Sequence, residues 1–150
     1  MNNEPLSPPL ALTLDDAAAL AGYARRAAQA AGVAAVFSLM TPHGQQRYFF
    51  SMDNALLISY SLAGEKAWTA VALRMPTADL ATLTQPGCSL YGLQSDHGVC
   101  CVGGGLPCWS RGQLLGGIGI SGGTAEQDIA IAQAALALFS QSHFPLTPYQ

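Results

Sequence analysis

The feature that most constrains the fold is a glycine-rich segment at residues 103–128, which reads GGGLPCWSRGQLLGGIGISGGTAEQD. Nine of the sixteen glycines in the chain lie between residues 103 and 123. Glycine lets another backbone or a ligand approach closely, but it loses more conformational freedom on folding than any other residue. So dense a cluster indicates either tight packing against a neighbouring element or a cradle for a ligand.

The same segment predicts a hairpin followed by a helix. An Arg-Gly pair at 111–112 separates two apolar runs, as a two-residue hairpin turn does, so strands are expected at 106–110 and 113–120. A Ser-Gly-Gly turn ends the second run. Thr124, with Gln127 three residues later, then forms a capping box that begins the last helix.

Hydrophobic periodicity and turn residues place the remaining elements. Hairpin-joined strands are antiparallel, so we predict an α+β domain in which helices flank a five-stranded antiparallel sheet. We expect an N-terminal arm at 1–12, a single domain at 13–140 and a tail at 141–150. The predicted helices are 14–31, 54–73 (with Asp53 as its N-cap), 78–83 and 125–140, and the predicted strands are 33–40, 46–52, 99–102, 106–110 and 113–120.

Composition limits the function classes. The chain is 50% hydrophobic but only 10% charged, against ~25% in ordinary soluble domains, so we expect a homo-oligomer that hides part of its surface. The net charge is −3 and there is no basic run, so no nucleic-acid partner is expected.

No apolar run approaches the ~20 residues of a membrane span, and nothing at the N-terminus resembles a signal peptide, so a cytoplasmic protein without a membrane partner is expected. The four cysteines lack metal-site spacing, and no metal is predicted.

The standard catalytic motifs are absent: there is no GxSxG, HExxH or GxxxxGK[ST] pattern, and no catalytic residue is predicted. The most informative polar residue is Lys66, which lies in an otherwise apolar helix and needs a partner, a route to solvent or a pocket. We expect it to face a cleft beside the glycine-rich strands, where it pairs with a carboxylate or meets an anionic ligand. An exposed lysine on the helix surface is the alternative. The predicted ligand-binding residues are Lys66, Asp53, Gly104, Gly105, Ser121, Glu126 and His97.

Several motifs together resemble one family, the GlcG-like or HbpS-like haem-degrading domains, which include the C-terminal domain of PduO-type proteins of propanediol utilisation. The similarity runs in order from about residue 12 to residue 140. The matching motifs are LTLDDA at 12–17, MD at 52–53, EKAWTA at 65–70, RMPT at 74–77, QPG at 85–87, YGL at 91–93, GGGLP at 103–107 and GGIGISGGTAEQD at 116–128.

The resemblance implies a profilin-like domain with a five-stranded antiparallel sheet, assembled into homo-oligomers. Some members bind haem or are linked to its degradation, whereas others are encoded with glycolate, propanediol or glycerol pathways. Haem-ligating members are associated with a His in the first helix, and residues 13–31 contain none here, so we expect weak haem affinity or none.

We therefore predict an accessory protein of a diol, glycerol or glycolate utilisation pathway, which binds a small molecule or cofactor and has no catalysis of its own. One alternative is a haem-binding or haem-degrading protein whose iron ligand is His97 or a sulfur. The other alternative is a purely structural oligomer without a ligand.

Overall fold

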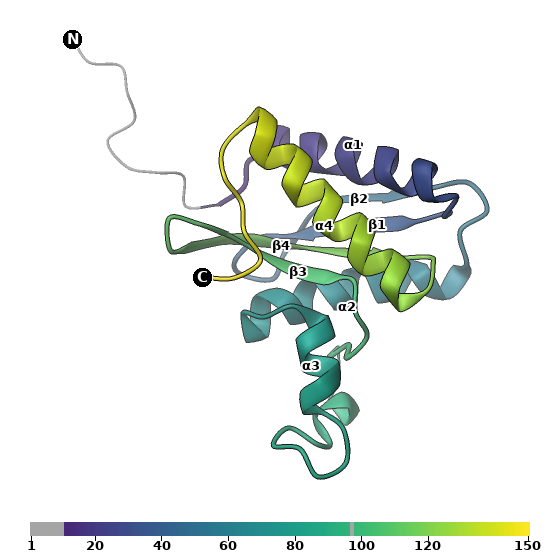
Figure 1. Ribbon diagram of the computed structural model, residues 1–150, viewed down its shortest axis with the longest axis vertical. Coiled ribbons are helices and arrows are strands. Elements are labelled where there is room, and N and C mark those ends of the chain that lie inside the picture. The colour runs from purple at the N-terminus through teal and green to yellow at the C-terminus, as the bar shows by residue number, and fades with distance from the viewer. Residues whose placement is uncertain (1–10, 97) are drawn as a thin grey trace.

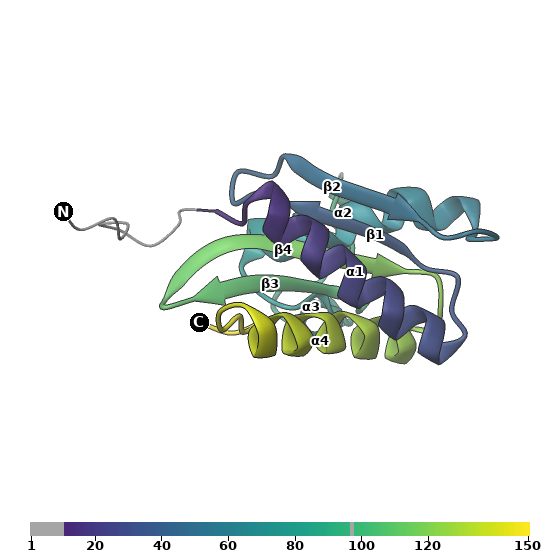
Figure 2. The same cartoon turned by 90° about the horizontal axis from the view of Figure 1, so that it is seen from above.

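The computed structural model describes residues 11–96 and 98–150, and these form three layers (Figure 1). Helices α1 (Leu14–Ala31) and α4 (Ala125–Ser142) pack on each other and cover one face of a sheet. Helix α2 (Leu57–Leu73) covers the other face, and the short helix α3 (Thr77–Leu83) adjoins it. Seen from above, α1 and α4 lie side by side over the strands (Figure 2). The predicted α+β class is confirmed.

The sheet contains four strands in the described part of the chain, one fewer than predicted. They are β1 (Val36–Met40), β2 (Gln46–Ser51), β3 (Gly105–Ser110) and β4 (Gln113–Ser121), in the antiparallel order β2-β1-β4-β3. The missing strand is the one predicted at 99–102. There the backbone N–H of Cys100 donates to the Thr69 hydroxyl on α2 at 2.9 Å, so this segment bonds to a helix side chain and not to a strand.

The ends of the elements follow local chemistry. The capping boxes at Thr13 and Thr124 are both present, and the predicted turn between β3 and β4 is confirmed, with positive φ at both central residues. The predicted start of α2 was three residues early. Asn54 has a φ of 68°, which a helix cannot contain, so α2 begins at Leu57 and Asp53 does not cap it.

The two faces of β4 differ in side-chain size. Ile118 and Ile120 point into the large apolar core beneath α1 and α4. Gly117 and Gly119 point toward α2, and a Cβ atom at position 119 would overlap the Ala63 carbonyl oxygen and lie 2.7 Å from the Ala67 nitrogen. The backbone of α2 therefore rests directly on β4. For these glycines, tight packing and not a ligand cradle is the correct interpretation.

No helix in the parts of the chain described here is both long and apolar enough to cross a lipid bilayer.

Replacing Gly119 by Val is expected to lower the free energy of unfolding by at least ~1–3 kcal/mol, because the side chain must push α2 away from β4. Chemical denaturation measures the change. Gly22→Ala is the matched control, because nothing lies within 4 Å of its added Cβ and it sits on an exposed face of α1. The control should be neutral or stabilise the fold by up to ~1 kcal/mol. Equal stability of Gly119→Val and the parent would show that α2 does not press on this strand.

Candidate functional site

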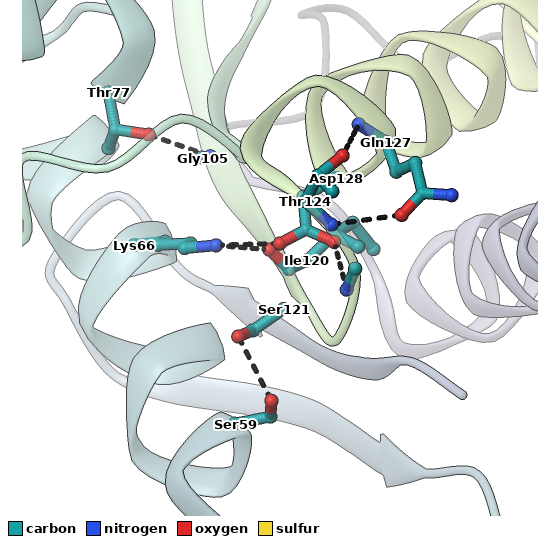
Figure 3. Close-up of polar contacts among 10 residues, drawn as sticks. Ser59, Lys66, Thr77, Gly105, Ile120, Ser121, Thr124, Gln127 and Asp128 are labelled. Atoms are coloured by element: carbon teal, nitrogen blue, oxygen red, sulfur yellow. Dashed lines mark hydrogen bonds and ion pairs between the residues drawn. The ribbon is translucent and has the colours of Figure 1, made fainter. Parts of the chain in front are cut away.

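A buried lysine joins the two helical layers. Lys66 projects from α2, and its side chain is directed toward the first turn of α4 (Figure 3). The residue is only 1% exposed. Its ammonium group donates to the carbonyl oxygen of Ile120 at 2.9 Å and to the Asp128 carboxylate at 3.1 Å. A buried cation is tolerated in this arrangement because it has both a counter-charge and a further hydrogen bond.

Asp128, like Lys66, is buried and makes more than one polar contact. It is 2% exposed, and its second carboxylate oxygen accepts from the backbone N–H of Gly123 at 2.8 Å. The carboxylate also lies in the first turn of α4, where the helix dipole favours a negative charge. The backbone of the glycine turn thus donates to a carboxylate of the protein itself.

The glycine run before β3 gives the lysine its space. Gly104 has a φ of 128°, and a Cβ atom there would lie 3.0 Å from the Lys66 nitrogen and 2.5 Å from the Ile120 oxygen. The neighbouring Gly105 donates from its backbone N–H to the Thr77 hydroxyl at 2.9 Å, which fixes the start of β3 beside α3 (Figure 3). Gly104 therefore leaves room for the ammonium group, whereas Gly105 lets β3 approach the backbone of α2.

The structure gathers some of the predicted site residues and separates others. The carboxylate partner expected for Lys66 is confirmed as Asp128, but the cleft expected around Lys66 is wrong, because its side chain is enclosed. Ser121 donates to the Ser59 hydroxyl on α2 at 3.2 Å. Glu126 points to solvent, and Asp53 lies at another place in the fold. His97 lies outside the described residues. A ligand role for these residues stays a prediction.

An open cleft lies where α1 ends and β2 leaves the sheet. Its volume is about 590 Å³, and it contains one cation, Arg25, and one carboxylate, Asp53. The Met52 sulfur accepts a weak bond from the Ala35 N–H at 3.4 Å. Sequence reasoning singled out Asp53 but missed Arg25 and Met52, because only the fold brings the end of a helix to the end of a strand. The cleft is lined by Arg25, Gln29, Gly32, Val33, Ala34, Phe50, Ser51, Met52 and Asp53.

The thiols and carboxylates offer little for metal binding. No group of three or more potential metal ligands occurs among the residues described. All four cysteines are free. Burial raises the pKa of the Cys108 thiol to about 12 and also raises the pKa of Cys100, so both stay protonated at neutral pH.

Comparison with known proteins gives consistent matches. A family profile described as "Haem degrading protein HbpS-like" matches residues 12–137. The corrinoid adenosyltransferase PduO of Salmonella typhimurium is 45% identical over 131 residues, which cover 86% of this chain but only 39% of the relative. An uncharacterized 15.0 kDa protein in the dhaT-dhaS intergenic region of Citrobacter freundii is 38% identical over 87% of this chain and 93% of its own length. The crystal structure of a PduOC:heme complex superposes with a TM-score of 0.87 at 42% identity, covering 93% of this chain and 99% of that one.

Lys66→Met is expected to lower the free energy of unfolding by about 3–5 kcal/mol, because Asp128 then remains buried without a counter-charge. Urea denaturation measures the loss.

Two further variants test the cause. Glu126→Gln removes an exposed carboxylate from the same helix turn and should change stability by less than about 0.5 kcal/mol. Lys66→Met combined with Asp128→Leu should recover part of the loss, because no unpaired charge remains. A Lys66→Met variant as stable as the parent would mean that the ion pair contributes nothing.

Proposed function

The chain belongs to the HbpS-like family, and we propose that it is a cytoplasmic accessory protein that binds a small molecule or cofactor in the cleft of Arg25, Met52 and Asp53. The observation that carries the proposal is the cleft itself. Its volume of about 590 Å³ is within the ~300–1,000 Å³ usual for ligand pockets. A guanidinium and a carboxylate stand beside apolar walls, so a ligand with polar groups at its edges and a less polar body fits the lining.

The proposed pathway is the use of a diol, glycerol or glycolate. It is supported by the resemblance to domains encoded with such pathways and by the relatives named PduO and dhaT-dhaS intergenic protein. Adenosyl transfer is not carried over to this chain, since the match spans 39% of the adenosyltransferase. The proposed role is binding without catalysis.

Haem binding is the second candidate, favoured by the haem complex of a structural relative at 42% identity. Helix α1 (Leu14–Ala31) offers no His in this chain, so an iron ligand has to come from elsewhere. Met52 brings a thioether to the cleft, and thioethers are established axial ligands of haem iron. Arg25 would pair with a propionate. The residues present therefore fit the group, although with a different ligand type from the His of haem-ligating family members.

Ligand binding is tested by thermal shift and by haemin titration. Propanediol, glycerol, glycolate and cobalamin are screened first, because a ligand selective for the folded state stabilises it by about 2.7 kcal/mol at 100 times its Kd. Arg25→Gln should abolish the shift given by a true ligand of the cleft. No shift with any of these compounds and no haemin binding would leave only the purely structural role.

Haemin separates the two candidates. Because α1 lacks a His, we expect weak haem affinity or none. A sharp Soret band at one haem per chain would instead establish haem binding. Met52→Leu should then remove the band, whereas Met75→Leu, which alters a methionine between α2 and α3, should leave it unchanged.

We also propose that the protein is a homo-oligomer. Consecutive apolar residues at the start of α2 are exposed to solvent, and Leu57 is 86% exposed. Such contiguous apolar surface is rare on monomers. This surface, which we call the α2 apolar patch, consists of Phe49, Leu56, Leu57, Ile58 and Tyr60.

Light scattering at micromolar concentration should give a multiple of the chain mass. Leu57→Asp should reduce the mass toward one chain, because it places a charge in the proposed interface. Leu14→Asp is the matched control: Leu14 is also an exposed apolar residue, but it lies at the start of α1 on the other side of the sheet. A monomeric parent protein would refute the proposal.

A further inference from the structure

A second hollow lies at the opposite end of the β1–β2 hairpin from the Arg25 cleft. It consists of two adjoining cavities of about 290 and 370 Å³, which share Pro42, His43, Arg74 and Leu114. The chain has two tryptophans, and both contribute, Trp68 to the first cavity and Trp109 to the second. We call this hollow the tryptophan groove.

The indole N–H of Trp109 is an unsatisfied hydrogen-bond donor in the described structure. The residue is 4% exposed, and its indole Nε1 is the one buried side-chain polar atom without a partner in residues 11–96 and 98–150. An indole N–H can only donate. Buried donors in native proteins are nearly always satisfied, so an orphaned one points to a missing acceptor.

Arg74 lies over this indole in an unusual backbone conformation. Its guanidinium carbon is 6.0 Å from the centre of the Trp109 ring. It forms no hydrogen bond or ion pair with any other described residue. Arg74 ends α2 with a φ of 54°, at a position where Gly is the usual residue. A guanidinium held at a strained backbone position, with a ring contact but no hydrogen-bonded or charged partner among the described residues, favours a functional role.

The groove is rich in hydrogen-bond donors: Arg74, His43, Gln113 and the Trp109 N–H can all donate. Among the described residues, no Asp or Glu side chain lines it. The Trp68 indole lies half-exposed along the same hollow, against Gly44 of the β1–β2 turn, and presents a flat apolar surface.

We propose that the tryptophan groove binds a small organic anion, whose carboxylate or phosphate accepts from Arg74 and from the Trp109 N–H. The exposed Arg74 side chain turns outward to admit it, and the planar apolar body of the ligand lies against Trp68. This site is separate from the Arg25 cleft and does not depend on the ligand proposed there.

The intrinsic fluorescence of the protein reports on this groove, because both tryptophans line it. The probes are benzoate, phenyl phosphate, inorganic phosphate and the neutral benzamide. We expect a saturable change with benzoate or phenyl phosphate, and the stronger of the two identifies the head group. Benzamide should have no effect, and inorganic phosphate should bind more weakly than phenyl phosphate. A response to benzamide equal to that of benzoate, or no response to either organic anion, would overturn the proposal.

Arg74→Gly separates binding from folding. It removes the cation and relieves the positive φ, so it should weaken anion binding at least about tenfold without lowering the melting temperature. Arg111→Gly is the matched control, since Arg111 has a φ of 51°, loses the same charge and lies outside the groove lining. It should leave the affinity within about twofold. Unchanged binding in Arg74→Gly would refute the assigned site.

Discussion

The ion pair between Lys66 and Asp128 joins helices that lie on opposite faces of the sheet. An ammonium group can be buried only if its charge is compensated, so its position depends on α4, on the end of β4 and on the glycine turn that holds Asp128. The pair also explains the glycine at position 104, where a Cβ atom would crowd the Lys66 ammonium group. A single polar contact thus links three layers whose remaining contacts are mostly apolar.

The glycines of β4 perform a different task from those before β3. They let the helix backbone of α2 touch the strand, and the small residues Ala63 and Ala67 complete this contact. The opposite face of β4 carries isoleucines, which fill the wider space beneath α1 and α4. The sheet is consequently asymmetric, with a close, rigid contact on one side and a thick apolar core on the other.

Much of this fold could be read from the sequence, because capping boxes, turn residues and apolar periodicity act locally. Two of the errors of assignment arose where the fold overrides the local sequence pattern. The Thr69 hydroxyl accepts the backbone N–H of Cys100 in place of a strand, and the turn at Asn54 moves the start of α2 to Leu57. The need of Lys66 for a carboxylate partner was predictable from its apolar neighbours, but its complete enclosure was not. Neither Arg25 with Met52 nor Arg74 with Trp109 could be paired from the sequence, since each pair is brought together only by the fold.

The place of Asp128 in the chain has a consequence for biosynthesis. In chain order, α4 follows every other helix and strand that the structure describes. Until α4 is synthesised, Lys66 on α2 has no carboxylate partner. One face of the sheet is then covered by α1 alone. The buried ion pair, and with it the final packing of α2 against α4, can form only after α4 has been synthesised.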